Sequence, residues 1–467
     1  MQSILQTLSA AELCDYLQGQ WHGAREKRLQ AVGAVCTDSR KLSKGNFFVA
    51  IRGENFDGHD FLAQVREAGA ELLVVEDPSR LTDGDVAIVV DDATLALGRL
   101  AKALIKIRRA AGNFELYAIT GSNGKTTCKE MLSALLTALG KNVLKTRGNF
   151  NNALGLPFTV FDLSLNHEAA VLEMGTNAVG EIAYLVDIAE PDVALITSIG
   201  DAHLQGFGTR EGVARAKGEI LASPNLRKAV MSAQLYDEFY SNALPASLLR
   251  CLGRDAKIHN LVSSASGLCF EYIEGEHQLS VELDVLGRHN AQNFALAMLC
   301  LGAERLNSDV VVRASALLEM PAGRLERYTS SVCELLHDAY NANPSSMRAA
   351  FRLMQDLRPS AERAYVIGEM AELGADSERM HYEVGGLLGA SAAKAVLFVG
   401  AKNAEAMAQG AKAAGLVSGS VHICSSEALG EGLEKFALCL APTDLCLIKG
   451  SRSMRLERVL EFWRAAR

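Results

Sequence analysis

One stretch of the sequence carries the residues of a phosphate-binding loop. It reads Thr-Gly-Ser-Asn-Gly-Lys-Thr-Thr over residues 120–127. Glycines let the backbone turn its N–H groups inward without a Cβ in the way, and a following helix N-terminus adds a partial positive charge. The ammonium of Lys125 can reach the β- and γ-phosphates, and the hydroxyl of Thr126 can ligate Mg²⁺. These residue types indicate the binding of a nucleoside triphosphate.

The elements on both sides of this loop are those that a phosphate loop requires. The apolar run 114–119 predicts a buried strand, and an amphipathic helix follows and ends at Gly140. Strand, glycine-bearing turn, Lys-Thr and helix occur in the expected order. The general pattern also has a glycine six residues before the lysine, where this sequence has Ile119. The loop is therefore shorter, and the alternative is a glycine-rich turn before an unrelated helix; the complete order favours a nucleotide site.

Two predicted strand ends supply candidate metal ligands. The strand 169–172 ends at Glu173, and the strand 191–198 leads into a glycine-bounded loop that contains His203. The carboxyl ends of parallel strands beside a phosphate loop are where a Mg²⁺ ligand belongs. A lone histidine is more often structural, but its position after a strand end favours a role in the site.

Three further segments suit either a ligand-binding role or an ordinary structural role. The asparagines of 149–152 can contact substrate or form an ordinary turn. The helix that begins after Gly287 carries Arg288, His289 and Asn293, which suit either a second nucleotide contact or plain capping. Lys217 lies in a helix predicted from residue 209 to about 221. From its neighbours alone, Lys217 is a solvated surface lysine near Glu219.

Polar residues also flank a predicted strand near the N-terminus. Residues 37–40 (Thr-Asp-Ser-Arg) precede the strand 45–51, and Asp57, Gly58 and His59 follow it. This arrangement can be an anion-binding edge or a polar turn beside a solvated arginine, and the residues alone leave both interpretations open.

Alternation of strands and helices predicts an α/β protein with three domains. A small N-terminal α/β domain is predicted over residues 1–90, and a central P-loop domain with a mostly parallel sheet over 91–322. A new series of alternating strands and helices begins after residue 322. Its predicted strands are 334–337, 365–368, 396–400, 421–424 and 445–449, and a terminal amphipathic helix follows them. This part, 323–467, is predicted to be a C-terminal Rossmann-like domain.

The overall composition narrows the functional classes. The 467 residues are 49% apolar and carry a net charge of −8, which argues against non-specific nucleic-acid binding and against an anionic membrane surface. The ten cysteines include no CxxC pair, as is typical of reduced thiols in the cytosol. Neither a signal peptide nor an apolar run of membrane-spanning length is evident. We therefore expect a cytoplasmic protein without membrane insertion.

Taken together, the motifs resemble those of the ATP-dependent Mur ligases. The resemblance extends from about residue 37 to 458 and rests on ten segments: 120–127, 149–152, 173–175, His203, Lys217, 287–293, 323–324, 338–344, 369–374 and 449–452. The shorter phosphate loop is the usual form in this family. Residues 38–40, 47–48, 57–59, 149–152 and 340–344 are similar to those of the family members that add a D-alanyl-D-alanine dipeptide.

The resemblance implies a role for each group of candidate residues. The ATP-binding residues would be Gly121, Ser122, Asn123, Gly124, Lys125, Thr126, Thr127, Asn293, Arg324 and Asp338. Two Mg²⁺ ions would be held by Thr126, Glu173, His203 and a carbamylated Lys217. The catalytic residues would be Lys125, Lys217 and His203. The substrate-binding residues would be Ser39, Arg40, Asp57, His59, Asn149 and Asn152 on the uridine-nucleotide side, and Asn341 and Asn343 for the dipeptide.

It also implies a reaction and its partners. The substrates would be ATP, UDP-N-acetylmuramoyl-tripeptide and D-alanyl-D-alanine, joined through an acyl phosphate by a monomeric enzyme. The nearer alternatives are another Mur ligase or a folylpolyglutamate synthase. The N-terminal module of about ninety residues argues against the folylpolyglutamate synthase. The more distant alternative is a P-loop NTPase that acts as a switch.

Overall fold

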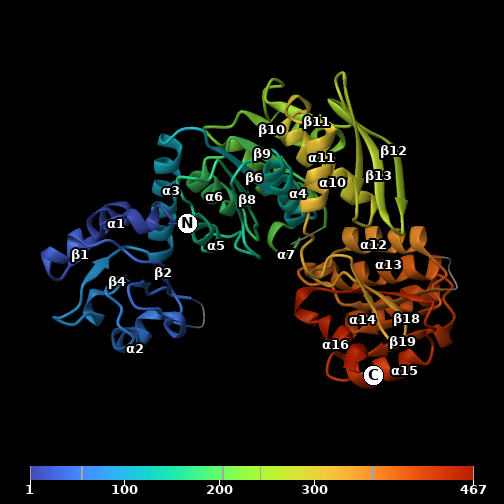
Figure 1. Cartoon of the computed structure of the whole chain (residues 1–467). Coiled ribbons are helices and arrows are strands. Elements are labelled where there is room, and N and C mark those ends of the chain that lie inside the picture. Colours follow the sequence, from blue (N-terminus) through green and yellow to red (C-terminus); the bar gives the residue numbers. More distant parts are fainter. Residues whose placement is uncertain (1, 54–55, 202–203, 242, 359–361, 466–467) are drawn as a thin grey trace.

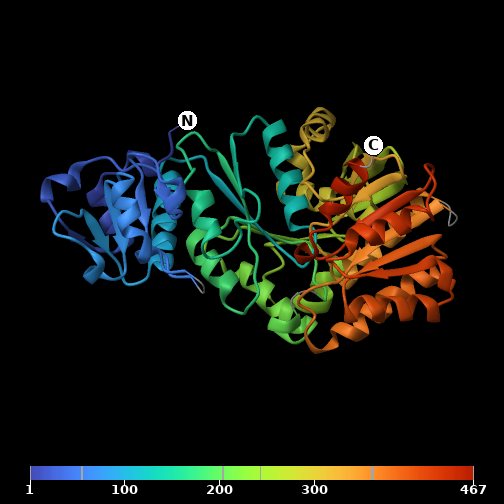
Figure 2. The same cartoon turned by 90° about the horizontal axis from the view of Figure 1, so that it is seen from below.

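The computed structural model describes residues 2–53, 56–201, 204–241, 243–358 and 362–465. These residues form three α/β units, each built around its own sheet. The N-terminal unit and the C-terminal unit lie on opposite sides of the central unit in both views (Figures 1 and 2). The predicted fold class is confirmed. No helix of the described ranges is long and apolar enough to cross a membrane.

The N-terminal unit has a five-stranded sheet in the order β1-β5-β4-β3-β2. Only β1 pairs antiparallel, with β5. The first helix begins at a capping box in which Ser9 and Glu12 bond each other's backbone N–H groups, as their spacing predicts. The elements are α1 (Ala10–Leu17), β1 (Gln20–His22), β2 (Val35–Cys36), β3 (Phe47–Val49), α2 (Leu62–Glu67), β4 (Leu72–Val75) and β5 (Ala87–Val89).

Helix α3 (Ala93–Ala110) connects this unit to the central one. Its residues Leu97, Leu100 and Leu104 recur at helical spacing and are fully buried. They belong to a single hydrophobic core that contains residues of β3 and β4 on one side and of helices α5 (Gly155–Val160) and α6 (Glu181–Ala189) on the other. The N-terminal and central units therefore share a continuous apolar contact.

The central unit has helices on both faces of its sheet. Strand β6 (Glu115–Thr120) lies between β8 (Ala169–Glu173) and β9 (Val193–Ile196), parallel to both. Leu116 and Ala118 face the core that contains α3, whereas Tyr117 and Ile119 face the core that contains α4 (Lys125–Ala138) and α10 (Arg288–Leu301). A parallel strand buried on both faces has side chains alternating between two apolar layers, which explains the continuous apolar run in the sequence.

The central sheet has nine strands in the order β14-β13-β12-β11-β10-β9-β6-β8-β7. Strands β12, β13 and β14 form an antiparallel meander at one edge of the sheet. Outside the sheet, the helix predicted over 209–221 is α-helical only to Gly218. The remaining elements are β7 (Val143–Lys145), α7 (Leu204–Phe207), α8 (Arg210–Gly218), β10 (Lys228–Ser232), α9 (Ala233–Leu235), β11 (Leu249–Leu252), β12 (Ala256–Ser264), β13 (Gly267–Glu274), β14 (His277–Leu283) and α11 (Ser308–Leu317).

The C-terminal unit has six strands in the order β15-β16-β20-β17-β18-β19, and only β15 is antiparallel. The terminal helix buries Val459, Leu460 and Trp463, the apolar face that its periodicity predicts. The elements are β15 (Glu326–Thr329), β16 (Glu334–His337), α12 (Pro344–Leu357), β17 (Arg363–Gly368), α13 (Ser377–Ala390), β18 (Ala395–Val399), α14 (Lys402–Ala413), β19 (Val421–Cys424), α15 (Leu429–Ala437), β20 (Leu445–Lys449) and α16 (Glu457–Ala465).

Candidate active site

The phosphate loop turns sharply between β6 and α4, and its geometry requires glycine at two positions. Gly121 and Gly124 have φ angles of +150° and +84°, which side-chain-bearing residues rarely adopt. A Cβ at Gly121 would lie 1.9 Å from Oγ1 of Thr197, and one at Gly124 would lie 2.8 Å from Oδ1 of Asn293. The second contact places the predicted ATP-binding residue Asn293 directly against the loop.

Hydroxyl groups at the end of β9 hold the loop in place. The backbone N–H of Ser122 donates to the carbonyl of Ser198 at 2.8 Å, and the N–H of Asn123 donates to Oγ of Ser198 at 2.9 Å. The hydroxyl of Thr197 donates to the carbonyl of Asn123. Sequence reasoning missed Thr197 and Ser198, although two adjacent hydroxyl residues at the end of a strand beside a phosphate loop were a usable signal.

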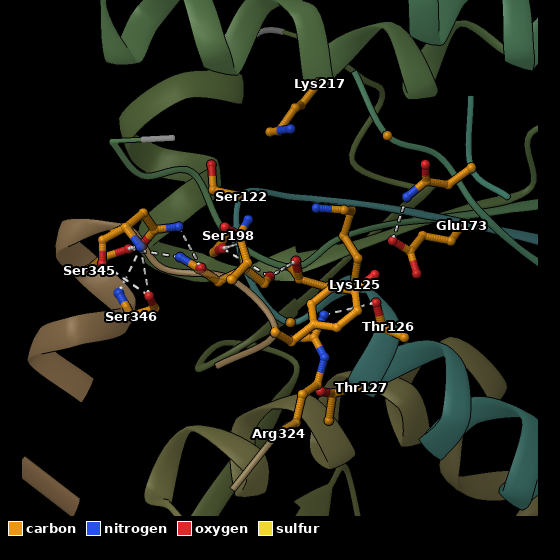
Figure 3. Close-up of a pocket in the computed structure, with 18 of the residues that line it drawn as sticks. Ser122, Lys125, Thr126, Thr127, Glu173, Ser198, Lys217, Arg324, Ser345 and Ser346 are labelled. Carbon is orange, nitrogen blue, oxygen red and sulfur yellow. Dashed lines mark hydrogen bonds between the residues drawn. The ribbon is translucent and has the colours of Figure 1, made fainter. Parts of the chain in front are cut away.

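A cavity of about 690 Å³ opens over the loop, between the central and C-terminal units (Figure 3). Its volume suits a nucleotide-sized ligand. Fourteen of the predicted site residues line it: Ser122, Asn123, Gly124, Lys125, Thr126, Thr127, Asn152, Glu173, Lys217, Asn293, Arg324, Asp338, Asn341 and Asn343. The structure thus brings together residues separated by more than two hundred positions in the chain.

Lys125 is folded over the loop to which it belongs. Its Nζ donates to the carbonyl of Gly121 at 2.7 Å. Burial lowers the pKa of this ammonium, while the nearby carboxylate of Glu173 favours the charged form. Figure 3 shows Lys125 and Lys217 directed into the same space.

Glu173, the last residue of β8, has one carboxylate oxygen held and one free. Asn151 Nδ2 donates to Oε1 at 2.9 Å. Oε2 is buried and has no hydrogen-bond partner in the described part of the chain. Because an unpaired buried carboxylate oxygen is costly, this atom is a fitting ligand for a cation. Sequence reasoning placed Glu173 correctly at the strand end but did not assign Asn151 a role.

Lys217 corrects the expectation of a solvated surface lysine. It is 1% exposed, and its ammonium makes no hydrogen bond or ion pair with any residue in the described ranges. Burial, together with the positive charge of Lys125, lowers its pKa to about 7. Glu219 is not its partner, because that carboxylate accepts hydrogen bonds from the backbone of Gly180 and Ala183 at the start of α6. His203, predicted to lie beside Lys217, falls outside the described residues.

Arg324 reaches the loop from the C-terminal unit. Its Nη2 donates to Oγ1 of Thr126 at 3.1 Å, and its guanidinium lies 4.6 Å from the ring centroid of Tyr340. Gly323 and Leu325 on either side have positive φ angles of +72° and +56°, so the backbone turns tightly around the arginine. Tyr340, which sequence reasoning did not assign to the site, fixes the plane of the guanidinium.

Asp338 is paired within the C-terminal sheet. Lys449 Nζ lies 2.6 Å from Oδ2 of Asp338 and also donates to the carbonyl of Asn341 at 3.2 Å. Because β16 and β20 are adjacent and parallel, their carboxyl ends place these residues together. Lys449 is 2% exposed and lines the cavity, although the sequence had indicated it only as part of a motif.

A ring of three side chains joins the phosphate loop to helix α12. Asn123 Nδ2 donates to Oγ of Ser345 at 2.7 Å and Asn343 Nδ2 donates to Oδ1 of Asn123 at 2.8 Å. Ser345 Oγ in turn donates to Oδ1 of Asn343 at 2.9 Å, and Asn343 also caps α12. The N-terminus of α12 therefore lies against the loop (Figure 3).

The other predicted substrate residues lie elsewhere. Asn149 is exposed and does not line the cavity, unlike Asn151 and Asn152. In the N-terminal unit, Ser39 bonds Gln64 at 3.2 Å and Arg40 pairs with Asp38 at 2.8 Å, both at the surface.

His59 belongs to the interior of the N-terminal unit. It is 3% exposed, its Nδ1 lies 2.6 Å from Oδ1 of Asp57, and its Nε2 accepts from the N–H of Glu76 at 3.0 Å. Both ring nitrogens therefore have partners inside this unit. His59 lies in a short 3₁₀ helix, Gly58–Phe61, and is the buried residue of that turn.

Three models of one protein family match most of the chain. Residues 31–105 match the Mur ligase family, catalytic domain; residues 119–301 match the Mur ligase middle domain; and residues 323–452 match the Mur ligase, glutamate ligase domain. The UDP-N-acetylmuramoyl-tripeptide–D-alanyl-D-alanine ligase of Escherichia coli is 35% identical over 97% of this chain and 98% of that protein. The chain belongs to the Mur ligase family. The ligase of the same name from Bacillus subtilis is also 35% identical, over 92% of this chain and 93% of its own length.

Two solved structures of MurF resemble this chain over more than nine-tenths of its length. The structure of MurF from Acinetobacter baumannii matches with a TM-score of 0.85 and 31% identity over 98% of both chains. MurF ligase from Thermotoga maritima in complex with ADP matches with a TM-score of 0.80 and 26% identity, over 92% of this chain and 97% of that one.

Proposed function

We propose that this Mur ligase uses ATP to join D-alanyl-D-alanine to UDP-N-acetylmuramoyl-tripeptide, giving the UDP-muramoyl-pentapeptide, ADP and phosphate. The names of its full-length relatives support the choice of substrates. The observation that carries the proposal is the cavity in which the phosphate loop, Glu173 and Lys217 face Arg324 and helix α12. A switch-type NTPase would not need the basic and polar groups of a second catalytic unit at its phosphate loop.

The reaction follows from the weakness of a carboxylate as an electrophile. The terminal carboxylate of the tripeptide attacks the γ-phosphate of ATP, which gives an acyl phosphate and ADP. The deprotonated amine of the dipeptide then attacks the acyl carbon, and phosphate leaves from the tetrahedral intermediate. Lys125 and Arg324 hold the phosphates and balance their charge, so the protein contributes mainly positioning and electrostatic stabilisation.

The donors in the site fit Mg²⁺ bound together with a nucleotide. In nucleotide sites Mg²⁺ uses one or two carboxylates together with phosphate oxygens and water. Glu173 offers its unpaired Oε2 and Thr126 its hydroxyl, and the described residues contain no larger acidic or histidine cluster that could hold a metal without the nucleotide. Bound there, Mg²⁺ would neutralise charge on the transferred phosphate. His203 remains the predicted ligand of a second ion.

Lys217 is proposed to be carbamylated. Its neutral amine attacks the carbon of CO₂, one N–H proton goes to solvent, and the product is a carboxylate-like group of charge −1. Only the neutral amine reacts, and a pKa of about 7 leaves about half of Lys217 neutral at pH 7, against about one part in 3,000 at the ordinary pKa of 10.5. The change from ammonium to carbamate would convert repulsion of a second Mg²⁺ into ligation.

The remaining assignments stay proposals that rest on the relatives. We assign residues 1–90 to UDP-substrate binding, 91–322 to ATP binding and 323–467 to the ligase function. Ser39, Arg40, Asp57 and the 149–152 loop would contact the uridine nucleotide, and Asn341 and Asn343 the dipeptide. The enzyme would work as a monomer in the cytoplasm.

The decisive test is phosphate release from ATP with a panel of UDP-muramoyl tripeptides and dipeptides. We expect turnover only when a UDP-tripeptide and D-alanyl-D-alanine are both present, with the pentapeptide identified by mass spectrometry. Tripeptides that end in lysine or in diaminopimelate would reveal the preferred substrate. Hydrolysis without any acceptor, or a preference for a single amino acid over the dipeptide, would contradict the proposal.

A further inference from the structure

A further buried lysine lies one helical turn beyond the phosphate loop and takes no part in the proposed reaction. Lys129 of α4 is 2% exposed. Its Nζ donates to the carbonyl of Thr146 at 2.7 Å and lies 2.8 Å from Oε1 of Glu130. The other oxygen of Glu130 lies 2.6 Å from Nζ of Lys145. Pairing and hydrogen bonding offset the cost of burying a charged group, and both partners of Lys129 lie at the junction of α4 with the end of β7.

Thr146 stands where the chain leaves the central sheet. Its N–H donates to the carbonyl of Val171 at 3.1 Å and so continues the pairing of β7 with β8. The next N–H along β8, that of Glu173, donates to the Thr146 hydroxyl at 2.9 Å instead of to a backbone carbonyl. Because Thr146 is 1% exposed, this side chain replaces a sheet hydrogen bond in a place closed to water.

We propose that Thr146 and Lys129 are positioning residues for Glu173. Lys129 fixes the carbonyl of Thr146, and the hydroxyl of Thr146 fixes the backbone of Glu173. At the far end of the same side chain Asn151 holds Oε1, so that Oε2 is the one carboxylate oxygen left without a partner among the described residues. Groups that orient a metal ligand typically change metal affinity by about 10- to 100-fold. The inference rests on the proposed function in one respect, that Glu173 ligates Mg²⁺.

A purely structural role makes a different prediction, and the chain offers a matched control for it. Lys141 lies at the opposite end of β7, where its Nζ is 2.8 Å from Oε1 of Glu168. This pair also ties the α4–β7 segment to β8, but at the end of the strand remote from the phosphate loop. Loss of Lys141 therefore tests what removing a lysine ion pair does to this segment without touching Glu173.

The test measures the Mg²⁺ dependence of nucleotide binding in four variants: Thr146→Val, Thr146→Ser, Lys129→Met and Lys141→Met. Calorimetry gives the affinity for a non-hydrolysable β,γ-methylene analogue of ATP, once in Mg²⁺ and once in EDTA. Valine has the shape of threonine without the hydrogen-bond acceptor, whereas serine keeps the acceptor. In the wild type, Mg²⁺ should raise the affinity for the analogue. In Thr146→Val and Lys129→Met this increase should be smaller by a factor of about ten or more. Affinity in EDTA should stay within about twofold, and Thr146→Ser and Lys141→Met should keep the gain.

Two results would overturn the inference. One is a wild-type Mg²⁺ gain in Thr146→Val. The other is a loss of affinity in EDTA as large as the loss in Mg²⁺, which would show a general structural role. Two other failures can be told apart from these. If Glu173 does not bind Mg²⁺, Glu173→Gln will keep the wild-type increase in nucleotide affinity on addition of Mg²⁺. If the proposed ligase function is wrong, the wild type will turn over ATP without the dipeptide.

Discussion

Replacing Lys217 by methionine should make the protein more stable at neutral pH while it abolishes ligation. The Lys217 side chain is buried, and its ammonium has no hydrogen-bond partner among the described residues. Methionine retains a long unbranched side chain that fills the same space. Most substitutions at fully buried positions destabilise a protein. Here the opposite is expected because the wild-type residue brings an unpaired charge into a buried position beside the positive charge of Lys125.

The magnitude follows from the depressed pKa. A pKa of about 7 in the folded protein, against 10.5 for an ordinary lysine, corresponds to on the order of 5 kcal/mol. Between these two values the unfolded chain binds more protons than the folded one, so wild-type stability rises with pH. The cost is fully present below pH 7, falls to about 2 kcal/mol at pH 9 and is gone above 10.5. The stabilising effect of Lys217→Met should shrink by about 3 kcal/mol between pH 6 and pH 9.

The assay is unfolding of the nucleotide-free protein by denaturant at pH 6, 7, 8 and 9, in buffers freed of CO₂ so that no carbamate forms. Arg215→Met is the matched control, because Arg215 is an exposed cation on the same helix and should show almost no pH-dependent difference. A Lys217→Met variant that is less stable than wild type at pH 6, or whose difference from wild type does not change with pH, would refute the reasoning. The burial of an ammonium would then not be the dominant effect.

Four further outcomes are expected. Lys125→Ala should cost roughly 3 kcal/mol or more of transition-state stabilisation, measured as kcat/KM for ATP; near wild-type turnover would remove the phosphate-loop assignment. Arg324→Ala should lower turnover by about 10²-fold while calorimetry shows an unchanged affinity for the UDP-substrate, and equal losses would contradict its proposed contact with ATP. Lys217→Ala should regain part of its lost ligase activity with added acetate, whose carboxylate can replace the carbamate; rescue by chloride as effective as acetate would argue for a salt effect. Asn123→Ala removes two hydrogen bonds to the C-terminal unit, worth about 2 kcal/mol together, and should shift the small-angle scattering profile toward more extended forms, whereas Ser346→Ala, which alters only the cap of α12, should not.

Local patterns in the sequence were sufficient to predict the phosphate loop. Its two glycines, Lys125 and Thr126 lie close together in the sequence. An apolar run indicates the strand before them, and helical periodicity indicates the helix after them. The same holds for Glu173, because a strand end places its final residue at the edge of a sheet whatever packs around it. Five of the six strands of the C-terminal unit, all but β15, were predicted for the same reason: the signal and the structure it specifies lie within a few residues.

Packing between distant segments decided the rest. Periodicity identifies the helix that carries Lys217 but not whether a neighbouring element covers that position, so burial reversed its predicted environment. Three asparagines in four positions look alike in sequence, yet the turn exposes Asn149 and directs Asn151 onto Glu173. The ring of Asn123, Asn343 and Ser345 joins residues more than two hundred positions apart. At that separation, local sequence preferences do not indicate which residues will pair. Contacts of this kind depend on how whole units pack, which only the tertiary structure determines.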